Sequence, residues 1–108
     1  MDGQSFLRTG GRAVELVDYQ DAAVVSRMLL KGPAGSVTAF ALDVHQELSE
    51  HTAPYDALLL ILDGEAEVRV AGVSHQLVTG DVLLLPANEP HAVKATKRFK
   101  MILTMMRP

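Results

Sequence analysis

Histidine is the residue of this chain best suited to chemistry near neutral pH, and the sequence holds four: His45, His51, His75 and His91. An imidazole can transfer a proton, polarise a carbonyl group or ligate a metal ion. Cysteine is absent, which excludes thiol nucleophiles, disulfides and thiolate metal sites. A site built around histidine therefore depends on how the chain brings these imidazoles together.

The elements that must position the histidines are predicted to be short β-strands. Short apolar or alternating runs recur between Gly, Pro and Asp residues, and no helical stripe exceeds a couple of turns. The expected strands cover residues 13–17, 24–31, 36–44, 57–62, 65–71, 74–78, 82–85, 91–95 and 98–105. This pattern predicts an all-β sandwich or closed barrel, since closure removes exposed strand edges.

Turn residues separate these runs. Residues 32–35 are expected to form a hairpin loop, and Gly80-Asp81 and the segment 86–88 mark two corners. Asp63-Gly64 is the strongest tight-turn signal, because glycine accepts the positive φ that such a turn needs.

Alternation along the strands predicts which side chains share a face. In the last strand Phe99, Met101, Leu103 and Met105 lie together, opposite a mostly polar set. Residues 57–62 and 82–85 are instead apolar on both faces, so one face should meet the barrel interior and the other a second layer. We expect a homodimer that buries these outer faces.

Length and charge limit the remaining possibilities. The chain has 108 residues, 48% of them hydrophobic, and is expected to form a single domain, with residues 1–12 as an N-terminal arm. A net charge of -3 and few aromatic residues argue against nucleic-acid binding, and the basic residues between positions 94 and 100 are expected to form a solvated strand face. No signal peptide is recognised and residues 57–62 are too short to cross a bilayer, so we expect a cytoplasmic protein without membrane contact.

Two segments resemble the signature motifs of the cupin superfamily. Residues 51–64 read HTAPYDALLLILDG and residues 80–91 read GDVLLLPANEPH. With the short stretch between them, they resemble a small single-domain bacterial cupin. The resemblance implies an RmlC-like antiparallel jelly-roll β-barrel, with residues 45–91 carrying both motifs.

The resemblance also shows where a metal would be held. The four positions that supply three His and one Glu in the family are His51, Ala53, Ala57 and His91. Alanine cannot ligate a metal, so no cofactor is expected; if any metal is bound, His51 and His91 would hold it. A third ligand would have to come from elsewhere, and the candidates are His45, Gln46, Tyr55 and Asp56.

We therefore expect a small-molecule-binding barrel with a mainly apolar pocket. His51 and His91 would be its polar anchors, held neutral by burial, although they could equally be two imidazoles that only bond to each other or to the backbone. The other expected lining residues are Phe40, Gln46, Ala53, Tyr55, Ala57 and Met101. Two alternatives stay open: a metal-dependent dioxygenase or isomerase with an unusual ligand set, and a structural or regulatory homodimer without a ligand. His75 is expected to be exposed.

Overall fold

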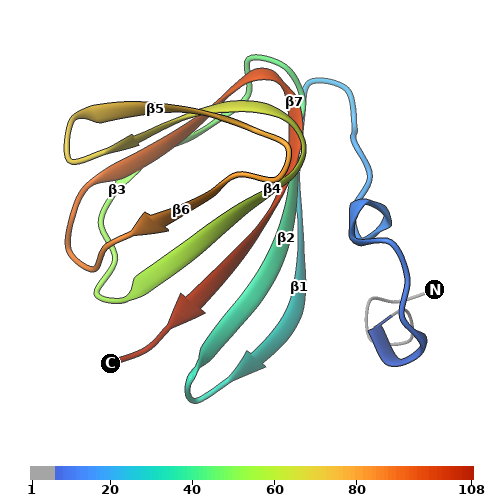
Figure 1. Ribbon diagram of the computed structural model, residues 1–108, viewed down its shortest axis with the longest axis horizontal. Helices are drawn as coiled ribbons and strands as arrows, with labels where there is room; N and C mark the ends of the chain where they lie inside the picture. The colour runs from blue at the N-terminus through green and yellow to red at the C-terminus, as the bar shows by residue number, and fades with distance from the viewer. Residues whose placement is uncertain (1–6) are drawn as a thin grey trace.

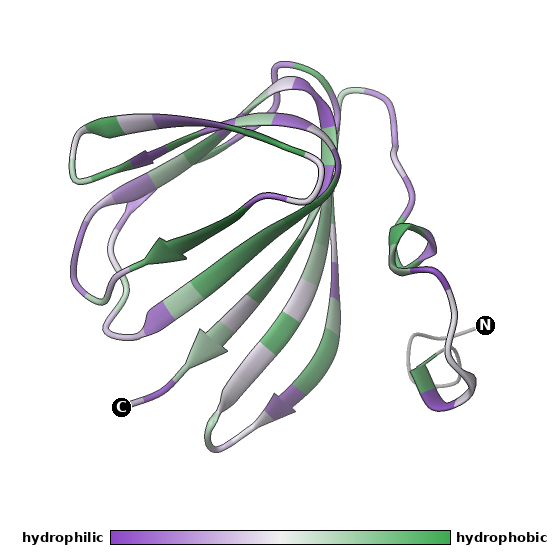
Figure 2. Cartoon of the chain, in the orientation of Figure 1, coloured by the Kyte–Doolittle hydropathy of each residue, from purple (hydrophilic) through white to green (hydrophobic). Residues whose placement is uncertain are grey.

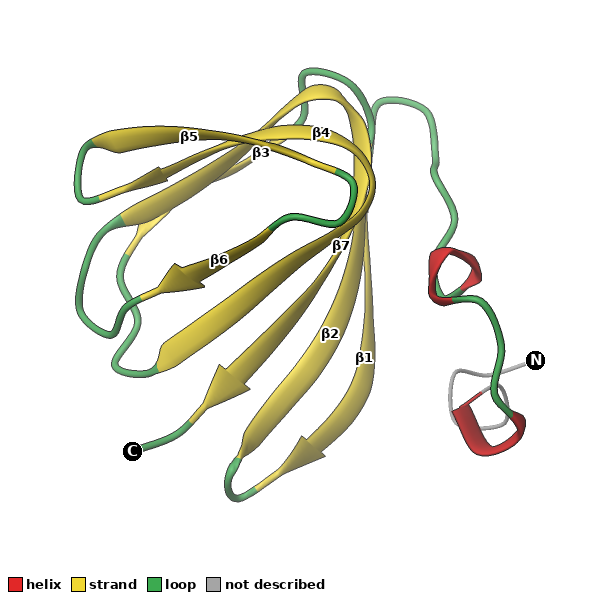
Figure 3. Ribbon diagram, in the orientation of Figure 1, coloured by secondary structure: helices red, strands yellow, loops and turns green. Residues whose placement is uncertain are grey.

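The computed structural model describes residues 7–108, and the part of the chain it describes is dominated by seven antiparallel strands (Figure 1, Figure 3). The strands are β1 (Val24–Gly32), β2 (Gly35–Leu42), β3 (Glu47–His51), β4 (Asp56–Val70), β5 (Val73–Val78), β6 (Val82–Leu85) and β7 (His91–Met106). A short 3-10 helix, η1 (Ala13–Glu15), precedes them.

Two long strands organise the barrel. β4 and β7 pair with each other along most of their length, and the seven strands form one continuous hydrogen-bonded sheet that branches at this pair. The sheet folds into two facing halves, which we call the two sheets, and β4 and β7 run through both. One sheet has the order β1-β2-β7-β4-β6, and the other has the order β3-β7-β4-β5. In Figure 1 the strands converge near the top of β7 and splay apart toward the opposite end. The predicted all-β antiparallel jelly-roll barrel is confirmed.

The strongest predicted turn is wrong. Asp63-Gly64 lies inside β4, where Asp63 pairs with Lys100 and Gly64 with Phe99. The positive φ of Gly64, 86°, serves an irregularity in the strand instead, because the register shifts on both sides of this pair. Such irregularities bend a strand and increase its twist, which is how β4 passes from one sheet to the other.

Three other expectations about strands were also wrong. Residues 91–106 form one strand, since no Gly or Pro interrupts them. Residues 13–17 do not form a strand: η1 covers Ala13–Glu15 and a bend follows it, so that Leu16 and Val17 are both buried, whereas a strand would point one of them outward. β3 was not predicted, because it has only one apolar residue, Leu48, to signal it.

The side chains of the barrel form two apolar clusters. The inner one fills the space between the sheets and includes Leu42, Leu59, Phe99 and Met101, each at most 1% exposed. The other lies on the outer face of β1 and β2, where Leu16 and Val17 cover Leu29, Ala39 and Ala41. The segment that precedes β1 is therefore part of the folded domain and covers the part of one outer sheet face formed by β1 and β2.

Polar contacts of Tyr19 hold this segment in place. The Tyr19 hydroxyl donates a hydrogen bond to Asp63 over 2.7 Å, and Arg98 lies 4.2 Å from the centre of its ring. Lys100 donates a hydrogen bond to the carbonyl oxygen of Val14. Burial of the phenol and its bond to Asp63 raise the pKa of Tyr19, so the ring stays neutral. Arg98 and Lys100 thus fix a chain segment to the sheet rather than forming an open basic face.

Further along this outer face, β4 and β6 present apolar side chains that no described residue covers. Leu58 of β4 pairs with Leu84 of β6, and both side chains are about half exposed, as is that of Val82. Figure 2 shows β6 and the part of β4 beside it as continuously hydrophobic. This uncovered strip lies on the same outer face as the cluster that Leu16 and Val17 cover. Among residues 7–108 no helix is long and apolar enough to cross a membrane.

We expect the uncovered strip to be the interface of a homodimer, because a small protein rarely leaves such a patch in water. Light scattering at micromolar concentration should give twice the mass of the chain. Leu84→Asp should yield a monomer, because burying an unpaired carboxylate in the interface is costly. Val73→Asp, at an equally exposed apolar residue on the other sheet, should remain dimeric. A monomeric wild-type protein would contradict this prediction.

Gly64 is predicted to be essential for closing the barrel. A methyl group on Gly64 would overlap the carbonyl oxygen of Arg98, whereas one on Gly72 would meet nothing. Both glycines have a φ near 80°, so Gly72→Ala measures the backbone strain alone. In chemical denaturation we expect Gly72→Ala to lower the free energy of unfolding by about 1 kcal/mol. Gly64→Ala should lower it by more than about 3 kcal/mol; equal losses would show that the close approach is not important.

Candidate functional site

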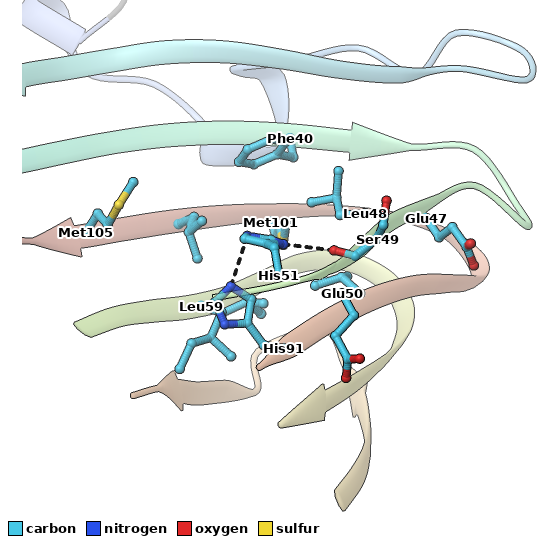
Figure 4. A pocket seen from close by; sticks show the side chains of 13 residues that line it. Phe40, Glu47, Leu48, Ser49, Glu50, His51, Leu59, His91, Met101 and Met105 are labelled. Atoms are coloured by element: carbon cyan, nitrogen blue, oxygen red, sulfur yellow. Dashed lines mark hydrogen bonds between the residues drawn. The ribbon is translucent and has the colours of Figure 1, made fainter. Parts of the chain in front are cut away.

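A cavity opens between the two sheets, and Figure 4 shows its lining. Its volume is about 600 Å³, within the range of small-molecule sites. Eight of the thirteen lining side chains are apolar, and the remainder come from β3 and the start of β7. The lining residues are Phe40, Glu47, Leu48, Ser49, Glu50, His51, Leu59, Leu85, His91, Val93, Met101, Leu103 and Met105.

A bulge in β3 aims His51 at this cavity. Leu48 pairs with Val93 and His51 pairs with His91, so three steps along β3 match two along β7. Leu48 already packs against the inner core, and simple alternation would point His51 the opposite way. The additional residue in β3 reverses that parity, which places both imidazoles on the inner side of the barrel.

The two rings are in direct contact. Their Nε2 atoms lie 3.1 Å apart, and their centres are 4.3 Å apart with the planes inclined at 70°. The other nitrogen of each ring reaches a backbone carbonyl: Nδ1 of His51 lies 2.8 Å from the oxygen of Ser49, and Nδ1 of His91 lies 3.3 Å from that of Glu89. Figure 4 shows the two contacts of His51. The rings are therefore oriented by the main chain and meet at their tips.

The two histidines differ in exposure. His91 is 8% exposed and lies on β7 between β3 and β4, whereas His51 is exposed at the cavity mouth. Burial lowers the pKa of His91, the charge of a protonated His51 lowers it further, and the Glu89 carbonyl partly opposes the change. The neutral form of His91 is thus favoured at neutral pH. Burial was predicted for both imidazoles, and for His51 that prediction is wrong, because β3 lies at the edge of the sheet and leaves this ring exposed.

Comparison with known proteins identifies the family. The sequence matches the cupin domain family over residues 39–106. The chain is a cupin. No curated protein matches the sequence.

Solved structures of similar proteins agree with this assignment. A cupin 2 conserved barrel domain protein from Leptotrichia buccalis is 38% identical, with 87% of this chain and 46% of that chain covered and a TM-score of 0.84. A conserved protein of unknown function from Streptococcus pyogenes is 32% identical, with 82% and 78% covered and a TM-score of 0.80. A cupin superfamily protein from Desulfitobacterium hafniense is 29% identical, with 90% and 89% covered and a TM-score of 0.87.

The structure brings half of the expected site residues together in this cupin. Phe40, His51, His91 and Met101 line the cavity. The other four, Gln46, Ala53, Tyr55 and Ala57, are not among its lining residues: Ala57 packs in the inner core, and Gln46, Ala53 and Tyr55 are half-buried elsewhere.

Sequence reasoning did not name most of the apolar walls. Leu103 and Met105 share the face of Met101 along β7, so alternation could have identified them. Leu59 and Leu85 lie on runs that are apolar on both faces, where no alternation distinguishes inside from outside. His75 is half-buried rather than exposed, because it pairs with the buried Val68 and so turns toward the inner side.

Two of the candidate third metal ligands have local structural roles. His45 has a φ of 69°, a backbone conformation typical of a tight turn, and its backbone N–H donates to the carbonyl oxygen of Ala95. Its side chain is exposed. Asp56 accepts a hydrogen bond from the backbone N–H of Ala87, so it fixes the corner after β6.

The residues present do not fit the metal centre of the family. Of the four ligand positions, Ala53 and Ala57 carry only methyl groups. In the part of the chain that the structure describes, no group of three or more His, Asp or Glu residues could hold a metal ion. Two imidazoles alone are a poor set for a first-row transition metal, which takes at least three protein ligands in its usual sites.

We predict that the protein purified without added metal contains no stoichiometric transition metal. Elemental analysis should find far less than one equivalent of Fe, Mn, Ni, Cu or Zn per chain. The double substitution Ala53→His with Ala57→Glu restores the family ligand set and should raise metal retention, provided the barrel tolerates the added bulk. The double variant Ala53→Gln with Ala57→Gln adds similar volume without that set and is the control. About one equivalent of metal in the wild type would contradict the prediction.

Proposed function

We propose that this cupin binds a small, largely apolar molecule inside its barrel. The observation that supports the proposal is the cavity of about 600 Å³, with eight apolar side chains and two imidazoles in its lining. Apolar walls with a few polar groups are typical of small-molecule sites, in which burial gives affinity and the polar groups give orientation. Each square ångström of apolar ligand surface removed from water contributes about 25 cal/mol.

The position of the polar groups supports the same function. Both imidazoles lie together on one wall of the cavity, where β3 meets the start of β7, whereas Leu103 and Met105 lie on the last part of β7, which belongs to the other sheet. A ligand with an apolar body and one polar end would match this division. His51 at the mouth and His91 within the barrel would contact the polar end.

The two alternatives have less support. A metal-dependent dioxygenase or isomerase would need a ligand set that the described residues do not supply. A homodimer without a ligand would use the exposed strip of β4 and β6, but that strip lies on the outer sheet face and leaves the cavity unexplained. Dimerisation and ligand binding use different faces, so both can hold for one protein.

We expect the cavity to bind 2-naphthol, an uncharged probe with an apolar body and one polar group. Isothermal titration calorimetry follows this binding in the wild type and in the variants alike, because it does not depend on the fluorescence of the probe or of the protein. Leu103→Trp should weaken binding at least tenfold, because the indole fills the cavity from β7. Lys97→Trp places the same ring on an exposed residue of that strand and should leave affinity unchanged. Binding that is absent, or insensitive to Leu103→Trp, would contradict the proposed function.

A further inference from the structure

The contacts of His51 establish where its hydrogen lies. A backbone carbonyl oxygen can only accept a hydrogen bond, and the oxygen of Ser49 is 2.8 Å from Nδ1 of His51. Nδ1 therefore carries the hydrogen. In the neutral ring the other nitrogen, Nε2, is then an acceptor, and this atom faces His91.

His91 must supply the hydrogen between the two rings. Two nitrogens 3.1 Å apart form a stable contact only when one donates to the other. The competing contact of His91, from Nδ1 to the oxygen of Glu89, is longer at 3.3 Å. The contact from Nε2 is the shorter and therefore the stronger hydrogen bond, so His91 carries its hydrogen on Nε2. The hydrogen bonds of the neutral pair thus run in one direction: His91 donates to His51, and His51 donates to the carbonyl oxygen of Ser49.

The direction of the hydrogen bond from His91 to His51 determines which chemical group of a ligand can be placed between the two rings. A group placed between the rings has to accept a hydrogen bond from Nε2 of His91 and donate one to Nε2 of His51. A hydroxyl group does both. An ether oxygen or a carboxylate only accepts, and an ammonium group only donates. On the basis of the proposed function, we propose that the ligand is an apolar alcohol or phenol whose hydroxyl inserts between His51 and His91.

The surroundings of the pair allow this insertion. The two nitrogens would have to separate to roughly 4.5 Å to hold an oxygen between them. His51 is exposed and lies on β3, whose one partner among residues 7–108 is β7, whereas His91 is buried on β7 between two neighbouring strands. His51 is therefore the ring that moves.

The charges around the cavity favour the same ligand class. Its lining contains no Lys or Arg, and its charged members are Glu47 and Glu50 on β3. An anionic ligand would find no cation to compensate its loss of water, and burying an unpaired carboxylate is costly. An uncharged hydroxyl avoids this cost.

Three probes with one apolar skeleton test the inference. We would titrate the protein at neutral pH with 2-naphthol, 2-methoxynaphthalene and 2-naphthoate, which carry a hydroxyl, an ether and a carboxylate. 2-Naphthol should bind roughly tenfold more tightly than either of the others, the gain expected from one additional net hydrogen bond.

Two phenylalanine variants test whether the preference for 2-naphthol comes from the pair of His51 and His91. His51→Phe removes the acceptor and should bring the affinity for 2-naphthol down to that for 2-methoxynaphthalene. His75→Phe changes a half-buried histidine on β5 that does not line the cavity, and it should keep the tenfold preference. A preference that survives His51→Phe would overturn the inference.

Nuclear magnetic resonance of the wild-type protein tests the same point without a substitution. Long-range proton–nitrogen spectra should show His51 with its hydrogen on Nδ1 and His91 with its hydrogen on Nε2. A hydrogen on Nδ1 of neutral His91 would overturn the inference.

The outcomes of the titrations separate this inference from the proposed function. Equal binding of 2-naphthol and 2-methoxynaphthalene, with both weakened by Leu103→Trp, would overturn the hydroxyl requirement and leave the proposed function standing. Failure of both probes to bind would overturn the proposed function, and this inference with it.

Discussion

The pairing of β4 with β7 is the interaction on which the rest of the structure depends. These two strands form the largest set of backbone pairs, and each contributes to both sheets. A strand shared between two sheets has to bend, and the bend in β4 is located at Gly64, where the backbone lies against Arg98 with no room for a side chain. β3, β5 and β6 each attach to only one of these two strands. The cavity exists because the two sheets diverge from this shared pair.

The sequence predicted the fold class well and the strand boundaries less well. Apolar runs and turn residues located β1, β2, β5 and β6, because each is short and bounded by Gly, Pro or Asp. Asp63-Gly64 was misread as a hairpin turn, since a positive φ is needed equally in a tight turn and in a bulge, and only the strand paired alongside distinguishes them. β3 was missed because its residues are polar and its partner, β7, lies some 40 residues further along the chain.

The candidate site could be predicted only where motif position and geometry coincide. His51 and His91 occupy motif positions, and the fold joins them across a bulge that no local pattern reveals. Ala53 and Ala57 occupy motif positions too, yet neither is among the residues that line the cavity. The direction of the hydrogen bonds in the pair depends on the carbonyls of Ser49 and Glu89, which every residue possesses and no sequence pattern can single out.

The attachment of β3 by one edge has a consequence for the motions of the barrel. Hydrogen exchange in native proteins proceeds by local opening, and segments with few backbone partners open at the lowest free energy. Within the described residues β3 is bonded along one edge, to β7, whereas β7 is bonded on both sides. The amides of β3 are therefore expected to exchange faster than those around His91. Local opening of β3 would expose the ring of His51 to solvent while β4 and β7 stay paired, so the two members of the histidine pair differ in how firmly the sheet holds them.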